Sequence, residues 1–184
     1  FTAGLVLAGC GQKQDSTATT QAQAKAETTT AAPTTATPTT ATPTTVAQAK
    51  TEMPAGAQKT VFEASAKGGT ETMTVYYKDD VLLKQETVEV YTLSQLEVEN
   101  ALEKLQNNTA RTKETLKDFI GKGFEYNTEH KGDIFTITYS FDYTKIDLDK
   151  LKEKIPGLDL RDDKTLSYSA FKEGLLKGGY KEKQ

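Results

Sequence analysis

Cysteine, histidine and tryptophan are nearly or wholly absent from the chain, with one, one and no copies. A disulfide needs two sulfur atoms, so a single Cys10 excludes any disulfide within the chain. His130 is the single histidine, and a zinc site or a histidine-led catalytic triad would need partners beside it. We therefore interpret His130 as a solvated residue of a charged hairpin loop.

A surplus of basic residues is also missing. Lys and Arg number 23 against 26 Asp and Glu, which gives a net charge of -3. Binding to nucleic acid needs a basic stripe that neutralises phosphates, so no nucleic-acid partner is expected. The sequence has no phosphate loop, dinucleotide fingerprint, nucleophile elbow or metalloprotease helix. We expect a non-catalytic, monomeric protein without a cofactor or a metal site.

Aromatic residues are missing from residues 11–58, where Thr, Ala and Gln fill 33 of 48 positions. The pattern Pro-Thr-Thr-Ala-Thr starts at Pro33 and again at Pro38. Such a segment has too little apolar surface to offset the entropy cost of ordering. We predict a disordered tether over residues 10–58 and a single folded domain over residues 59–184. The tether is either a passive linker or, because threonine stands beside proline, an O-glycosylated stalk.

The start of the chain is an apolar run that ends at Cys10 and is too short to span a bilayer. We interpret residues 1–9 as the truncated hydrophobic region of a signal peptide. Leu7, Ala8, Gly9 and Cys10 resemble the lipobox of bacterial lipoproteins, in which the cysteine sulfur receives a diacylglyceryl group. The resemblance implies attachment to membrane lipid through Cys10, on the outer face of the cell membrane. A long spacer after the anchor suits a thick envelope of the Gram-positive type.

Alternation of apolar and polar residues predicts strands at 60–66, 71–78, 81–92, 124–129 and 134–143. The last of these strands has the clearest pattern. One of its faces is apolar and the other is rich in hydroxyl groups, which indicates an antiparallel sheet covered on one side only. The apolar face comprises Phe135, Ile137, Tyr139, Phe141 and Tyr143, and the polar face comprises Thr136, Thr138, Ser140 and Asp142.

Helices are predicted to supply the cover. Ser94 and Glu97 form a capping box at the start of a long helical segment, with a break expected at residues 107–109 and a stop at Gly121 or Gly123. Asp147 and Ser167 are predicted to cap two shorter helices, which end at Pro156-Gly157 and near Gly178. The fold class is thus α+β, with an antiparallel sheet of about five strands and helices packed on one face.

Besides the lipobox and the order of these elements, four segments are distinctive: Thr72-Met73-Thr74-Val75-Tyr76-Tyr77, Gly121-Lys122-Gly123-Phe124, Ile146-Asp147-Leu148 and Ile155-Pro156-Gly157. Together they resemble the YehR-like bacterial lipoproteins, whose domain has no assigned function. The resemblance covers most of residues 59–180. It implies a fold and a location, but no active site.

The hydroxyl-rich side of the sheet is the ligand surface that we consider first. It comprises Thr72, Thr74, Thr136, Thr138 and Ser140, and it suits a cell-wall polymer or an envelope protein. Solvated threonines with ordinary strand propensity explain the same residues. Tyr139 and Tyr143 belong mainly to the core, but a tyrosine hydroxyl needs water or a partner and so can line a groove.

The sequence leaves two alternative functions open. A small apolar ligand carried between the sheet and the helices is one. The other is a carboxylate-dependent hydrolase using Asp159, Asp162 or Asp163, which crowd one loop. Their oxygens also suit calcium, but the glycine turn and the distal glutamate of a calcium loop are missing, so a solvated acidic loop is favoured.

Overall fold

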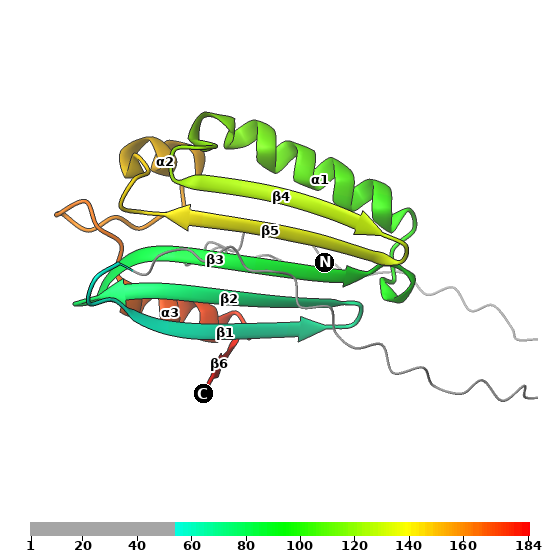
Figure 1. The fold of residues 1–184 in the computed structure, drawn as a ribbon, viewed down its shortest axis with the longest axis horizontal. Coiled ribbons are helices and arrows are strands. Elements are labelled where there is room, and N and C mark those ends of the chain that lie inside the picture. Colours follow the sequence, from blue (N-terminus) through cyan, green and yellow to red (C-terminus); the bar gives the residue numbers. More distant parts are fainter. Residues whose placement is uncertain (1–53) are drawn as a thin grey trace, which may run out of the picture. The chain divides into compact units, whose positions relative to one another are not determined.

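The computed structural model describes residues 54–184. This part of the chain forms an α+β fold, in which an antiparallel sheet is combined with three α-helices (Figure 1). The strands are β1 (Gln58–Ala66), β2 (Gly69–Lys78), β3 (Val81–Thr92), β4 (Phe124–Lys131), β5 (Ile134–Asp142) and β6 (Lys181–Lys183). The helices are α1 (Ala101–Thr115), α2 (Leu148–Lys154) and α3 (Tyr168–Lys177). Cys10, the lipobox and residues 10–53 of the predicted tether lie outside the described residues.

The sheet has the strand order β4-β5-β3-β2-β1-β6. The five strands predicted from the alternation pattern are all present, and the α+β fold class is confirmed. The sixth strand is the short charged segment near the end of the chain. It pairs with β1, with Glu182 opposite Phe62 and with the Lys183 ammonium 2.5 Å from the Glu63 carboxylate.

One face of the sheet is apolar, as its sequence pattern predicts. Phe135, Ile137 and Phe141 of β5 are at most 2% exposed. The register places Met73 and Val75 of β2 on the same face, and both are fully buried. Side chains alternate between the two faces of a strand, so this pairing gathers the apolar residues of neighbouring strands into one layer.

The helices contact this apolar face. Tyr168 at the start of α3 stacks on Tyr77 of β2, with ring centroids 3.5 Å apart, and its hydroxyl donates to Thr60 of β1 over 2.9 Å. From α1, the Lys113 ammonium lies 5.9 Å from the ring centroid of Tyr126 on β4. The helices therefore cover the side of the sheet that carries the aromatic side chains, and this face is named the helix-facing side below.

The start of α1 differs from its prediction. Ser94 lies in a short 3-10 turn and does not cap α1; its backbone N–H and its hydroxyl instead donate to the Asp133 carboxylate in the β4–β5 hairpin. The helix begins at Ala101, after Asn100 in a left-handed conformation with φ of 55°. The long-range contact with Asp133 satisfies Ser94, so the capping box is not used.

The predicted break at residues 107–109 is also wrong, because α1 runs without interruption to Thr115. Thr109 donates its hydroxyl to the Gln106 carbonyl over 2.9 Å, so its side chain is satisfied within the helix. The backbone then reaches Gly123, which has φ of 103°. A side chain at Gly123 would place its Cβ 2.9 Å from the Asp142 carbonyl oxygen, so the chain needs glycine at this turn into β4.

The starts of the other two helices are confirmed. The Asp147 carboxylate accepts the backbone N–H of Lys150 over 3.2 Å, and the Ser167 hydroxyl accepts that of Ala170 over 3.2 Å. Each side chain thereby satisfies a backbone N–H that has no partner within its helix.

Candidate functional site

The five hydroxyl residues predicted as a ligand surface lie on one face of the sheet, opposite the helix-facing side. Along one row of the register Thr138 of β5, Val88 of β3 and Thr72 of β2 are neighbours, and along another Ser140 and Thr74 flank Glu86. Thr138 is exposed, whereas Thr74 is 8% exposed. We call the set of Thr72, Thr74, Thr136, Thr138 and Ser140 the hydroxyl face.

The two tyrosines of the predicted surface lie elsewhere. Tyr139 and Tyr143 are 3% and 6% exposed, and both belong to the core on the helix-facing side. The Tyr143 hydroxyl donates to the Gln85 side-chain carbonyl over 2.9 Å, and burial raises the pKa of Tyr143. The structure therefore separates these tyrosines from the threonines, because residues 138 and 139 point to opposite sides of β5.

In the acidic loop between α2 and α3, Asp163 has a structural role. The Asp163 carboxylate accepts the backbone N–H and the hydroxyl of Thr165, over 3.0 and 2.5 Å. These hydrogen bonds lower the pKa of Asp163. Asp159 and Asp162 are exposed. Within residues 54–184, no group of three or more His, Cys, Asp or Glu side chains is placed to hold a metal ion.

His130 lies near the end of β4 rather than in the loop itself. Its Nε2 atom is 2.7 Å from the Gly132 carbonyl oxygen, so the ring donates a hydrogen bond across the turn when Nε2 carries the proton. The ring is exposed, and its centroid lies 6.2 Å from that of Phe135. His130 therefore stabilises the β4–β5 hairpin through the hydrogen bond to Gly132 and the contact with Phe135.

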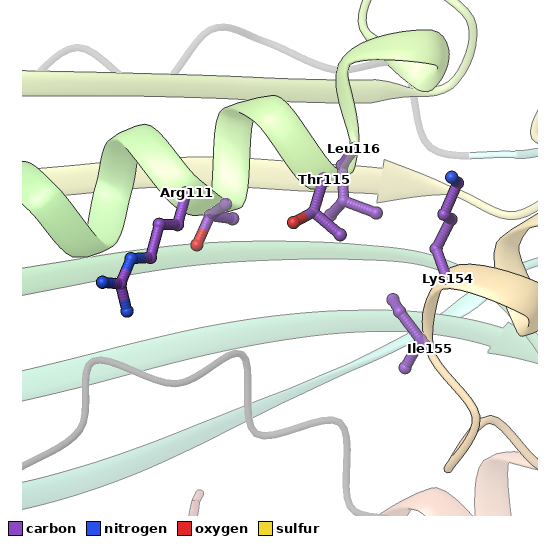
Figure 2. A pocket seen from close by; sticks show the side chains of 6 residues that line it. Arg111, Thr115, Leu116, Lys154 and Ile155 are labelled. Atoms are coloured by element: carbon purple, nitrogen blue, oxygen red, sulfur yellow. The ribbon is translucent and has the colours of Figure 1, made fainter.

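A pocket of about 220 Å³ lies between the C-terminal ends of α1 and α2 (Figure 2). We call it the α1–α2 pocket. Figure 2 shows Arg111 extending from α1 on one side, while Lys154 and Ile155 approach from α2 on the other. Its lining residues are Arg111, Thr112, Thr115, Leu116, Lys154 and Ile155.

The lining combines positive charge, hydroxyl groups and apolar surface. Arg111 and Thr115 are four residues apart on α1, so they share one side of the helix. The Thr112 hydroxyl donates to the Asn108 carbonyl over 3.1 Å and is therefore already engaged. Leu116 is 2% exposed and forms a fixed apolar wall. No acidic side chain lines this pocket, so its chemistry suits an anion better than a cation.

A second cluster of polar side chains lies on the helix-facing side of the sheet. Glu71 of β2 and Glu89 of β3 are directly opposite in the register. The Tyr180 hydroxyl donates to Glu71 and the Tyr91 hydroxyl donates to Glu89, each over 2.7 Å. We call these four residues the carboxylate–tyrosine cluster. Like charges on directly opposed residues destabilise a sheet. The hydrogen bond from each tyrosine hydroxyl stabilises its carboxylate and so offsets part of this repulsion.

Burial controls the protonation of this cluster. Glu89 is 4% exposed, and burial raises its pKa to about 7, against the lowering effect of the Tyr91 hydrogen bond and with a further rise from the charge of Glu71. Burial also raises the pKa of Glu71, while the Tyr180 hydrogen bond opposes the rise. A carboxyl group that holds a proton near neutral pH can act as an acid, a base or a pH-dependent charge.

Sequence reasoning did not find either the α1–α2 pocket or the carboxylate–tyrosine cluster. The pocket joins Arg111 to Lys154 across two helices, and no local pattern relates them. The cluster left a weak signal, because Glu71 and Glu89 each stand two residues from a buried side chain of the same strand, Met73 and Thr87. Period-two spacing from Met73 places Glu71 on the helix-facing side, whereas the burial of Thr87, and with it the side on which Glu89 lies, is seen only in the structure.

Among residues 54–184, no helix combines the length and the apolar character needed to cross a membrane. The chain is 29% identical over 129 residues to the uncharacterised lipoprotein Lin0239 of Listeria innocua, covering 68% of this chain and 80% of that protein.

The fold is similar to the NMR structure of the Escherichia coli YehR protein, with a TM-score of 0.51 and 20% identity, over 71% of this chain and 93% of YehR. The resemblance to YehR-like proteins predicted from the sequence is thus confirmed. Residues 58–181 match the family described as "Protein of unknown function (DUF1307)", and the chain belongs to this family.

Proposed function

We propose that the protein is a lipid-anchored extracytoplasmic binding protein. The lipobox-like segment Leu7-Ala8-Gly9-Cys10 supports the anchor, as does the similarity to a Listeria protein named a lipoprotein. A diacyl group meets the requirement that stable anchoring takes two chains or two signals. The threonine-rich residues that follow place the domain at a distance from the membrane, which suits an envelope of the Gram-positive type.

The domain in this proposal binds a small ligand and catalyses no reaction. The α1–α2 pocket carries the proposal, because it combines unlike lining groups at one place: two cations, two threonines and two apolar side chains. Ligand sites are typically concave and mainly apolar, with a few placed polar groups that fix orientation. A volume of about 220 Å³ accommodates a small molecule or one segment of a longer one.

A ligand screen followed by NMR tests this proposal. Small neutral, anionic and cationic compounds are added to the isotope-labelled full chain, and amide shifts are recorded. We expect saturable shifts centred on Thr112, Thr115 and Ile155 for at least one class. Shifts scattered over the surface, or no saturable shifts at all, would contradict a ligand site in this pocket.

The hydroxyl face supports a second candidate, a contact with a wall polysaccharide. None of the helix–sheet contacts described above involves this face, and its threonines occupy neighbouring strands in register. Sedimentation of the full chain with purified cell walls tests the idea. Thr138→Lys should reduce binding, whereas Thr128→Lys at an exposed position of β4 should not. Equal binding by both variants would remove this candidate.

A further inference from the structure

From the lining of the α1–α2 pocket we infer that its ligand carries an anionic head and a short apolar chain. This inference rests on the proposed function, since the pocket must first bind small molecules. It goes further by fixing both the charge of the ligand and its orientation.

The first step concerns charge. Arg111 and Lys154 line the pocket, and among residues 54–184 neither has an ion-pair partner. On α2, by contrast, the Lys150 ammonium lies 3.9 Å from the Asp147 carboxylate. Both cations that line the pocket are therefore available to an anion.

The second step places the anion. α1 ends at Thr115 and α2 ends at Lys154, so both helices end beside the pocket. The carbonyl groups at a helix C-terminus carry partial negative charge and disfavour a nearby anion. Arg111 lies one turn before the end of α1, and its planar guanidinium can bind two oxygens of a carboxylate or phosphate at once. The anionic head is therefore assigned to the side of the pocket formed by Arg111.

The third step places the apolar chain. Leu116 is held in the core at 2% exposure, and Ile155 is half-buried at the end of α2. Figure 2 shows these two side chains on the α1 and α2 sides of the pocket, on the side away from Arg111. A ligand with its head at Arg111 therefore lays its apolar part between Leu116 and Ile155, and Lys154 borders that part.

The size of the pocket restricts the chain. A volume of about 220 Å³ is below the range of about 300–1,000 Å³ that is typical for drug-sized ligands. The pocket accordingly accommodates the head and a few carbon atoms. A short-chain carboxylate and the phosphate end of a phospholipid share this chemistry, and the experiment has to separate the two sources.

Three probes that differ in charge and share a six-carbon chain test the inference. Hexanoate, 1-hexanol and hexylammonium are titrated into the isotope-labelled full chain, and affinities are taken from amide shifts. We expect hexanoate to bind most tightly. Arg111→Gln should weaken hexanoate binding about tenfold or more, because it removes the charge-assisted hydrogen bonds of the guanidinium, and should leave the affinity for 1-hexanol unchanged.

Further variants separate the loss of a cation at the pocket from the loss of a cation elsewhere on the protein. Lys154→Gln should weaken hexanoate binding less than Arg111→Gln does, because Lys154 borders the apolar part of the ligand. Lys152→Gln, at an exposed position on the same helix, should leave it within twofold of the unaltered chain. Ile155→Ala should weaken hexanoate and 1-hexanol alike, since it removes apolar contact and no charge. The thermal midpoint of each variant shows whether it is folded.

Vesicles distinguish the two sources of the anion. If the protein co-sediments with phosphatidylglycerol vesicles and Arg111→Gln abolishes this, the natural ligand is a lipid headgroup. If hexanoate binds but vesicles do not, the natural ligand is a free small anion. Tighter binding of hexylammonium than hexanoate, or an unchanged hexanoate affinity in Arg111→Gln, would overturn the inference while leaving the proposed function intact. If none of the probes binds and no compound of the wider screen does, both fail.

Discussion

Glu89 places an ionisable carboxyl group beneath the helices, where water is largely excluded. Its side chain depends on one hydroxyl donor, Tyr91, and it faces a second carboxylate, Glu71, on the neighbouring strand. A buried carboxylate with no cation beside it is costly to ionise, which explains why its pKa is about 7 rather than 4.5. Among the described residues this is the group that we expect to make stability depend on pH near neutrality.

The sign of that dependence follows from the direction of the pKa shift. Between about pH 4.5 and 7 the folded protein retains a proton on Glu89 that the unfolded chain has already lost. The stabilisation contributed by Glu89 is therefore fully present below about pH 4.5, is lost as the pH rises through this window, and is absent above about pH 7. The raised pKa of Glu71 acts in the same direction. The shift of Glu89 corresponds to a loss of about 3 kcal/mol in the free energy of unfolding.

Glu89→Gln tests this expectation, because glutamine has nearly the same shape and its carbonyl oxygen still accepts from Tyr91. The variant should be more stable than the unaltered protein at pH 8. Its free energy of unfolding should change little between pH 5 and 8, whereas that of the unaltered protein falls. Urea unfolding at a series of pH values gives the measurement. Glu125→Gln, at an exposed position of β4, is the control and should keep the decline. A flat profile for the unaltered protein would contradict the burial argument.

At the scale of elements, the contact between the β2–β3 turn and the start of α3 holds two distant parts of the chain together. Asp79 and Asp80 both have positive φ, at 48° and 60°, as a two-residue hairpin turn with right-handed twist requires. The Asp80 carboxylate accepts the backbone N–H of Ser169 over 2.7 Å and the Ser167 hydroxyl over 3.0 Å. Asp80 therefore supports the helix start from outside the helix.

Alanine at each of the two turn positions separates this contact from the turn itself. Asp79→Ala and Asp80→Ala place the same residue type at a positive φ, so their backbone cost is similar. Only Asp80→Ala also removes the bonds to α3, and it should be the less stable of the two by about 1–3 kcal/mol at pH 7. Chemical denaturation measures the difference. Equal stability of the two variants would show that the turn, and not its contact with α3, determines the effect.

Much of the element order was predictable, because local patterns specify it. Alternation in residues 134–143 predicts β5 and its buried face, and Asp147 and Ser167 begin helices as their side chains indicate. The failures share a physical cause. Ser94 is drawn to Asp133 by a contact 39 residues away, which no local capping pattern contains. Tertiary contacts of this kind outweigh local propensity.

The candidate site was less predictable for the same reason. On β3 the apolar side chains of Val88 and Val90 alternate with Glu89, so hydrophobicity alone favours the valines as the buried set. The register with β5 decides otherwise, since Glu89 lies opposite Ile137. The α1–α2 pocket depends on where two helices end in space. Its residues become a group only after the fold brings Arg111 and Lys154 to the same pocket.

At the scale of the whole molecule, the chain combines a domain that belongs to one family with a long segment of different composition. The family match spans residues 58–181, and the described elements lie within residues 58–183. By contrast, residues 11–58 contain no aromatic residue. In the proposed function this segment sets how far the domain reaches, while Cys10 sets where the molecule is held.

Substitution of Cys10 tests that arrangement directly. Serine cannot form the thioether that carries the diacylglyceryl group, so Cys10→Ser should move the protein from the membrane fraction to the soluble fraction when it is expressed in its native host. The expected change is nearly complete, since a diacyl anchor holds far more strongly than a single chain. Mass spectrometry of the N-terminal peptide should show the lipid on the unaltered protein only. Gln12→Ser, which adds the same hydroxyl and keeps the sulfur, should stay at the membrane. Equal release of both variants would exclude Cys10 as the anchor, and so would an unmodified thiol on membrane-bound protein. Neither result bears on ligand binding by the α1–α2 pocket, which the titrations test separately.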